Sequence, residues 1–269
     1  RHKGAVEGSE PDMFIGMANR IPDWSAVVGL IGTGQEIHDG EESGLQQWVD
    51  AIVNTGSIDN WDIHAPPGII EQLETGNIES YSEPYLTLNT TIRTHFGEKL
   101  HYWVDGVLGH VETPYQDLVE LYAELKKSGF KIYFTDNLRK AKMYLWNRYE
   151  KSPDARYGMI CSSRDKTLAN YGMKTLGWPK TLNYGRWYNE SQKHADSCCA
   201  LDLAVTEFDS QGLELDCTLV GWGADFILQD GKWNNDLARN YAHTSKIKDA
   251  FTLRRNAYRV LLTRARDGM

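Results

Sequence analysis

The second half of the sequence alternates short apolar runs with amphipathic stretches, and this alternation constrains the fold more than any other feature. Residues 131–135 and 157–161 have the length and composition of buried strands. Residues 138–145, between these runs, carry apolar side chains at helical spacing, and residues 114–129 form a further helix that a proline begins and a glycine ends. Strands that alternate with helices predict the α/β class, with a parallel sheet, helices on both faces and right-handed crossovers.

Residues 204–216 (AVTEFDSQGLELD) are the segment in which such a fold would place a ligand. An apolar run ends in Thr206, a turn containing Gly212 follows, and Glu214 leads into the next apolar run. Ligands in open α/β sheets bind at the carboxyl ends of strands, so we expect this segment at that edge of the sheet. The alternative is a surface loop between two core strands.

The C-terminal segment 253–269 predicts a helix with one apolar face and many arginines. The apolar side chains recur at helical spacing, so one face packs inward; they are Leu253, Ala257, Val260 and Leu261. Five arginines fill much of the rest: Arg254, Arg255, Arg259, Arg264 and Arg266. Arg266 follows Arg264 by two residues, roughly 200° further round a helix at ~3.6 residues per turn, so the two side chains cannot face the same group. Arg266 is expected to form a salt bridge or to lie on the side of a phosphate.

A third segment, VVGLIGTGQEIHDGEE at residues 27–42, combines an apolar run with a glycine turn. The run 26–31 predicts a buried strand, and the turn that follows it leads to Gln35. A glycine turn after a strand is weak evidence for phosphate binding by itself. The histidine and acidic residues within 38–42 lack a second group of ligands at suitable spacing, so no metal site is predicted.

These three segments together resemble motifs of the superfamily 1 helicases, most closely the Schlafen-type (group 3) DNA/RNA helicase domain, a family of P-loop ATPases. Residues 27–42 resemble motif III, although Thr33 stands where aspartate is common and the spacing is one residue shorter. TEFDSQGLELD resembles motif V and YRVLLTRAR resembles motif VI, in the family's order. The resemblance implies RecA-like lobes: residues 1–80 would be the C-terminal part of the first lobe, and residues 81–269 the second lobe with motifs IV to VI.

The resemblance also implies roles at a nucleotide. Gln35 would sense the γ-phosphate or the attacking water, and Arg264 would be the arginine finger that stabilises transition-state charge. Arg93 follows a strand expected at residues 85–91, is similar to the motif IV arginine and would contact the nucleotide. The alternative for Arg93 is a surface arginine, and the alternative for Arg264 is an arginine that caps its helix or forms an ion pair.

Motif V would contribute to nucleotide and nucleic acid alike. By the same resemblance, Gly212 would let the backbone approach the phosphate, and Glu214 would accept a hydrogen bond from the ribose. Thr206 is similar to the hydroxyl on the nucleic-acid side, where it would bind a backbone phosphate.

The expected cofactors are ATP and Mg²⁺, although this sequence lacks two of the sequence patterns that bind them. The pattern GxxxxGK[ST] is absent, since near Gly177 the residue Pro179 separates glycine from lysine and removes an N–H. No apolar strand followed by DEAH or DEAQ occurs either. In the family both lie upstream of motif III, so we expect a fragment that is inactive alone and works with an upstream RecA-like lobe.

The expected partner is single-stranded DNA or RNA, bound through local patches, because a net charge of −8 argues against electrostatic nucleic-acid binding by the whole chain. One alternative is a helicase-like ATPase that acts as a switch or scaffold without unwinding. Another is a nuclease that uses Asp209, Glu214 and Asp216, but no lysine follows these carboxylates at useful spacing.

Composition indicates an ordinary globular protein, with 41% apolar and 25% charged residues in a chain long enough for two modest domains. The four cysteines form no CxxC pair and no clear disulfide framework, which indicates a reducing, cytoplasmic setting. No apolar run reaches transmembrane length and no signal peptide is visible, so no membrane association is expected.

Overall fold

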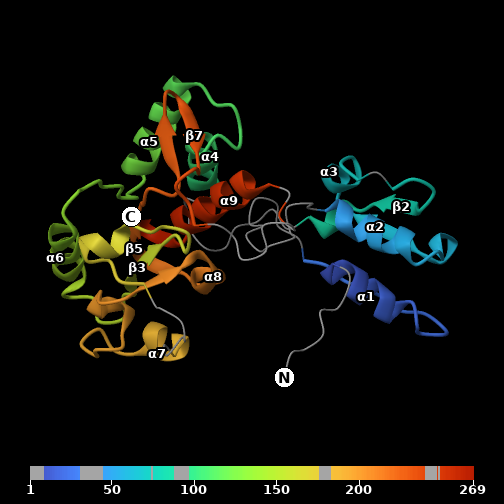
Figure 1. Ribbon diagram of the computed structural model, residues 1–269, viewed down its shortest axis with the longest axis horizontal. Coiled ribbons are helices and arrows are strands. Elements are labelled where there is room, and N and C mark those ends of the chain that lie inside the picture. The colour runs from blue at the N-terminus through green and yellow to red at the C-terminus, as the bar shows by residue number, and fades with distance from the viewer. Residues whose placement is uncertain are drawn as a thin grey trace. The chain divides into compact units, whose positions relative to one another are not determined.

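The computed structural model describes residues 9–30, 45–73, 75–87, 97–175, 183–239, 247 and 249–269. These residues belong to two compact units, Arg1–Thr90 and Thr91–Met269, which we describe one at a time (Figure 1). Two predicted site residues, Gln35 and Arg93, lie outside the described residues, as does the acidic stretch 38–42. The roles predicted for Gln35 and Arg93 therefore stay predictions.

The first unit has a small core and a two-stranded parallel sheet. Its elements are α1 (Glu10–Ala18), α2 (Gln46–Asn54), η2 (Ile58–Asn60), β1 (Asp62–Ala65), α3 (Pro67–Ile70), β2 (Glu79–Ser82) and η3 (Pro84–Leu86). Helix α1 begins after Ser9 because Ser9 and Asp12 form a capping box, in which each side chain bonds the other residue's backbone N–H. Strands β1 and β2 pair in parallel. The buried core residues are Ile15, Val49, Ala51, Ile52 and Ile78.

Two predicted strands, at residues 26–31 and 85–91, are wrong in the part that the structure describes. Residues 26–30 form no strand, and Val28 and Leu30 are 84% and 83% exposed. Among the described residues no strand pairs with this run, and strand formation depends on such a neighbour more than on local propensity. The strand expected from Tyr85 begins instead as the 3-10 helix η3, with Pro84 in its first turn.

The second unit is built on a four-stranded sheet in which all neighbouring strands are parallel. The strands are β3 (Tyr157–Cys161), β4 (Ala204–Thr206), β5 (Leu215–Gly221) and β8 (Ala265–Gly268), in the order β4-β3-β5-β8. The predicted strand 131–135 lies beside β8, where Tyr133 N donates to Met269 O at 3.0 Å, but only an isolated bridge forms there. The predicted α/β class and parallel sheet are confirmed.

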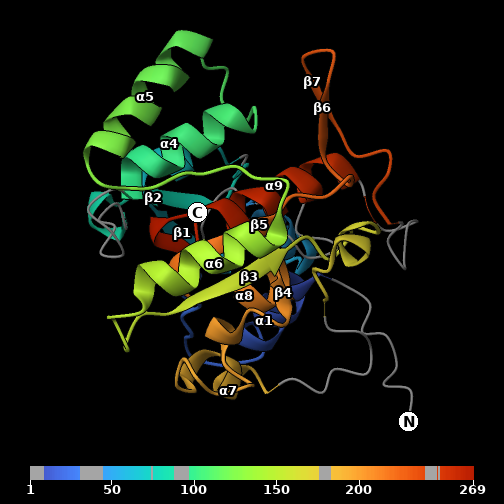
Figure 2. The same ribbon diagram turned by 90° about the vertical axis from the view of Figure 1, so that its left-hand side faces the viewer.

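Helices cover both faces of this sheet. They are α4 (Gly97–Val107), α5 (Tyr115–Lys127), α6 (Leu138–Tyr149), α7 (Tyr184–Asn189), α8 (Glu207–Ser210) and α9 (Ala250–Leu262), with the 3-10 helices η4 (Leu168–Tyr171) and η5 (Cys198–Ala200). In Figure 1, α6 lies on one side of β3 and β5, and α8 and α9 lie on the other. Figure 2 shows an antiparallel hairpin, β6 (Ile227–Gln229) with β7 (Lys232–Asn234), that projects away from the sheet. None of the helices in the described ranges is both long and apolar enough to cross a membrane.

The parallel arrangement gives the sheet two different edges. Cys161 of β3 is level with Thr206 of β4 and with Gly221 of β5, so these strand ends define the carboxyl edge. Leu215 and Ala265 pair at the starts of β5 and β8, and they define the amino edge. Residues of functional interest occur at both edges.

Acidification is expected to weaken the second unit through His110, which follows α4. Burial, together with the cations Arg255 and Arg259 and against the opposing effect of Asp105, lowers the pKa of His110 to about 4. The unfolded chain, whose histidine pKa is 6.5, therefore binds the proton first, and stability falls as the pH drops from 6.5 towards 4. Because His110 is only partly buried, we expect a loss of about 1 kcal/mol between about pH 7 and pH 5.

Urea unfolding at these two pH values, for the wild type and for His110→Gln, measures this effect. The variant should lose less stability on acidification than the wild type. Equal losses in the two proteins would show that His110 is not the group responsible.

Candidate functional site

The amino edge brings together the second half of residues 204–216 and the end of the C-terminal segment. Leu215 N donates to Arg264 O at 2.9 Å, so Glu214 and Arg264 lie at the starts of the neighbouring strands β5 and β8. Gly212 adopts a left-handed conformation (φ 85°), and no described atom lies within 4 Å of where its Cβ would be. Three residues predicted for a nucleotide site thus belong to one edge of the sheet.

Residues 204–216 do not lie at the carboxyl edge along their whole length. Thr206 ends β4 at the carboxyl edge, but α8 and the turn after it carry the chain back to the amino edge, where Glu214 precedes β5. The predicted location is right for Thr206 and wrong for Gly212 and Glu214. The reason is topological, because a strand parallel to its predecessor must begin at the opposite edge of the sheet.

The side chain of Arg264 is buried just after the end of α9, and the residue is only 2% exposed. Its Nε donates to Val260 O at 3.1 Å, and its Nη2 donates to Thr263 Oγ1 at 3.4 Å. A guanidinium that bonds a carbonyl in the last helical turn also offsets the partial negative charge of the helix C-terminus. The structure therefore displays the helix-capping geometry that was the alternative for Arg264, and its role at a nucleotide stays a prediction.

Arg266 lies in a strand, because α9 ends at Leu262 and β8 begins at Ala265. The helical rotation predicted between Arg264 and Arg266 is therefore wrong, although the two side chains do differ in burial. Arg266 Nε donates to Glu214 Oε2 at 3.0 Å, and Arg266 Nη2 makes a second bond to the same oxygen. The side chains of Arg266 and Glu214 are 48% and 21% exposed, so a ligand at the amino edge can compete with this ion pair.

The three carboxylates considered for a nuclease do not share a site. Asp209 accepts a hydrogen bond from Thr206 Oγ1 at 2.7 Å near the carboxyl edge, whereas Glu214 pairs with Arg266 at the amino edge. Asp216 Oδ2 accepts a backbone N–H bond at 2.6 Å. Within the described ranges, no three His, Cys, Asp or Glu side chains gather so that they could hold a metal ion. The nuclease alternative therefore gains no support from the geometry.

Thr206 stands at the carboxyl edge, where the sequence predicts a contact with nucleic acid. It precedes α8, and its N and Oγ1 donate to Asp209 Oδ2 at 3.2 Å and 2.7 Å. Tyr184 OH donates to the other oxygen of the Asp209 carboxylate at 2.6 Å. The Thr206 hydroxyl can donate to a phosphate only if its bond to Asp209 opens, and this role of Thr206 stays a prediction.

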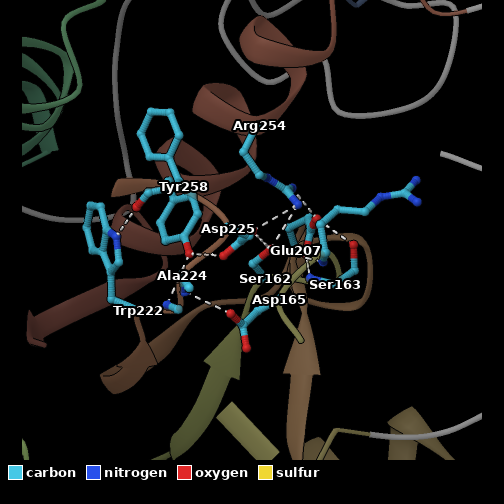
Figure 3. A network of polar contacts seen from close by, with 12 residues as sticks. Ser162, Ser163, Asp165, Glu207, Trp222, Ala224, Asp225, Arg254 and Tyr258 are labelled. Carbon is cyan, nitrogen blue, oxygen red and sulfur yellow. Dashed lines mark hydrogen bonds and ion pairs between the residues drawn. The ribbon is translucent and has the colours of Figure 1, made fainter. Parts of the chain in front are cut away.

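A buried polar network beside Thr206, which sequence reasoning missed, occupies the carboxyl edge (Figure 3). The chain beyond β3, β4 and β5 contributes Ser162, Glu207 and Asp225, and α9 contributes Arg254 and Tyr258. We call these five residues the carboxyl-edge network. All five side chains are buried, so each charged member needs partners to offset its loss of hydration.

Glu207 joins the start of α8 to the turn after β3 and to α9. Its carboxylate accepts hydrogen bonds from Arg254 Nη2 at 2.6 Å, from Ser163 N at 2.7 Å and from Ser163 Oγ at 2.8 Å. Glu207 directly follows Thr206 in the sequence. The residue next to the predicted nucleic-acid contact is therefore held by α9.

Asp225 joins the loop after β5 to the same helix. It accepts hydrogen bonds from Ser162 Oγ and, at 2.6 Å, from Tyr258 OH, and it forms an ion pair with Arg254 Nη1 at 3.3 Å. Arg254 Nη1 also donates to Ser162 Oγ at 2.8 Å. Burial, followed by the nearby charge of Asp225, raises the pKa of Tyr258 well above its usual value, so the phenol keeps the proton that it donates.

Asp165 adds a second tie between the loops after β3 and β5 (Figure 3). Its carboxylate accepts from the backbone N–H groups of Ala224 at 2.8 Å and of Thr167 and Leu168 at 2.6 Å each. Burial acts to raise the pKa of Asp165, but the bonds from Leu168, Thr167 and Ala224 outweigh it and the pKa is lowered. Asp165 therefore stays ionised near neutral pH and keeps these loops tied.

The carboxyl-edge network holds chain segments in position, because its donors and acceptors bond one another. Helical periodicity alone does not predict it, since that pattern assigns an arginine beside Leu253 to the solvent side, whereas Arg254 is buried. Two partners of Arg254, Glu207 and Ser162, are 47 and 92 residues away from it in the sequence. A usable signal is the presence of polar residues directly after strands, since such positions meet at one edge of a parallel sheet.

A four-stranded parallel sheet with helices on both faces places the second unit in the α/β class and is consistent with a RecA-like fold. The chain belongs to the family described as Schlafen group 3, DNA/RNA helicase domain, whose model matches residues 2–269. No curated protein and no solved structure matches it. The family resemblance noted in the sequence is confirmed, and the family indicates a helicase-like function in general terms.

Proposed function

We propose that this chain is the C-terminal portion of an ATP-dependent superfamily 1 DNA/RNA helicase or translocase. The observation that carries the proposal is the match of the helicase-domain family along nearly the whole chain. The parallel sheet, with motif V and motif VI residues side by side at its amino edge, supports it. Residues 1–80 are assigned to the end of the first RecA-like lobe and residues 81–269 to the second.

The amino edge suits one side of an ATP site. Arg264 and Arg266 are cations there, Glu214 is a partly exposed carboxylate, and the space beside Gly212 lets a ligand approach the backbone. When bound, ATP supplies the phosphoanhydride bond whose hydrolysis drives movement on a nucleic acid. Glu214 would accept from the ribose after release from Arg266, and Arg264 would stabilise charge on the transferring phosphoryl group after leaving Val260 O.

The remaining ATP-binding groups are assigned to an upstream RecA-like lobe. This sequence contains neither GxxxxGK[ST] nor DEA[QH]. Mg²⁺ would therefore be held by upstream residues, with Gln35 and Arg93 adding contacts from this chain. The four cysteines are free and buried, which supports a reducing, cytoplasmic location.

The carboxyl edge is the proposed site for single-stranded DNA or RNA. Thr206 stands there next to the carboxyl-edge network, and a backbone phosphate would replace Asp209 as the partner of its hydroxyl. The main alternative, a helicase-like ATPase that serves as a switch or scaffold, is favoured by the net charge of −8, which disfavours broad electrostatic attraction to nucleic acid.

ATP turnover of the full-length protein, measured with and without single-stranded DNA or RNA, tests the proposal. We expect nucleic acid to raise turnover about tenfold or more, and a tailed duplex to be unwound. Stimulation without unwinding or movement would favour the switch. An ATPase that no nucleic acid stimulates would refute the helicase proposal.

The 269-residue chain alone should show no turnover, because it lacks a phosphate loop.

A further inference from the structure

Helix α9 is bonded, through Arg254 in its second turn and Tyr258 in its third, to polypeptide that follows three different strands. Arg254 bonds Ser162 after β3 at 2.8 Å and Glu207 after β4 at 2.6 Å, and it pairs with Asp225 after β5 at 3.3 Å. Tyr258, one turn further along, adds its bond to Asp225. A single guanidinium therefore fixes the position of α9 relative to the whole carboxyl edge.

The other end of the same helix leads into the amino edge. From Arg254 the helix runs eight residues further to its end at Leu262, roughly 12 Å at ~1.5 Å per residue, and Arg264 follows two residues later. Between them, Ala257, Val260 and Leu261 are fully buried in close-packed surroundings. A helix packed in this way moves as a rigid element, so a displacement of the helix at Arg254 also displaces Arg264.

Binding at Thr206 would disturb the network directly. Thr206 and Glu207 are consecutive, and Glu207 divides its carboxylate between Arg254 of α9 and the backbone and hydroxyl of Ser163. A phosphate that drew the Thr206 hydroxyl away from Asp209 would open the bond that holds the turn carrying Glu207. We propose that Arg254 is a positioning residue that couples single-stranded nucleic acid bound at Thr206 to ATP turnover at Arg264.

This proposal rests on the proposed function and goes beyond it by naming the connection between the two edges. Stability alone does not require an ionic triad here, since apolar side chains of similar volume often replace all three members of such a triad without loss, although removal of one member alone is costly. What apolar side chains cannot do is hold three separate segments by directional bonds. Lysine cannot reproduce these bonds either, because it lacks the planar fork of donors that reaches Ser162 and Glu207 together.

The test compares Arg254→Lys with Arg259→Lys in the full-length protein. Arg259 lies on the same helix and pairs with the Asp105 carboxylate, with the two side chains 12% and 18% exposed, but Asp105 belongs to α4 and not to the carboxyl edge.

ATP turnover is measured without nucleic acid and with increasing oligo(dT) or oligo(U), and melting temperatures are recorded. We expect Arg254→Lys to lower the ratio of stimulated to basal turnover about tenfold, with basal turnover kept within about twofold. Arg259→Lys should keep the ratio.

A second variant covers the case in which Arg254→Lys does not fold. Tyr258→Phe keeps the ring in its aromatic cluster and removes only the hydroxyl, which donates to Asp225 and accepts from Gly223 N, and it should lower the same ratio by a smaller factor. An unchanged ratio in the folded Arg254 and Tyr258 variants, or an equal loss in Arg259→Lys, would overturn the coupling role while leaving the proposed function intact. A wild-type protein that nucleic acid does not stimulate would remove the proposed function itself, and this proposal with it.

Discussion

Replacement of Arg264 by alanine is expected to lower the ATP turnover of the full-length protein by about a thousandfold or more. An arginine at the γ-phosphate stabilises charge that exists only in the transition state, so its loss reduces kcat more than it changes KM. The effect should be measured as steady-state turnover with saturating single-stranded nucleic acid. Turnover within about tenfold of the wild type would reject Arg264 as the finger and leave helix capping as its role.

Two further variants separate catalysis from capping. Arg264→Lys keeps a cation that can bond Val260 O and should preserve the melting temperature, yet it should still lose most of the turnover because it lacks the guanidinium geometry. Arg186 is an exposed arginine of α7 that pairs with Glu190 and Asp196 in the segment after this helix. Arg186→Ala should therefore leave turnover unchanged. If loss of turnover follows loss of melting temperature across these variants, the effect is structural.

Replacement of Arg254 by methionine is expected to lower the free energy of unfolding by about 3–5 kcal/mol. The variant leaves Glu207 and Asp225 buried without their shared cation, and a buried carboxylate without a counter-charge is costly. Urea-induced unfolding measures the change. The triple variant Arg254→Met, Glu207→Gln, Asp225→Asn should recover part of the loss, because it removes the uncompensated charges along with the cation. A loss below about 1 kcal/mol in the single variant would contradict the network's energetics.

The architecture of the second unit could be predicted because its signals are local. Residues 157–161 are apolar throughout and become β3, which is buried at every position. The alternation of such runs with helical patterns dictates parallel pairing, and the structure has it. The run 26–30 has a similar composition but forms no strand, because strand pairing depends on a neighbour that composition does not reveal.

The candidate site was predictable only where sequence and topology agree. Motif-like segments located Thr206, Glu214 and Arg264, but assigning all of 206–214 to one edge overlooked that β5 starts at the opposite edge from the end of β4. The burial of Arg254 depends on partners far away in the sequence. The helical periodicity of apolar residues does not predict the burial of a charged side chain whose charge is neutralised by tertiary contacts.

A structure of the full-length protein with a non-hydrolysable ATP analogue, Mg²⁺ and single-stranded nucleic acid would test whether the amino edge of this sheet closes onto ATP. We expect that Glu214 leaves Arg266 for the ribose and that the Arg264 guanidinium leaves Val260 O and lies about 3 Å from a γ-phosphate oxygen. A nucleotide bound away from the amino edge, with Arg264 still capping α9 and Glu214 still paired with Arg266, would contradict it.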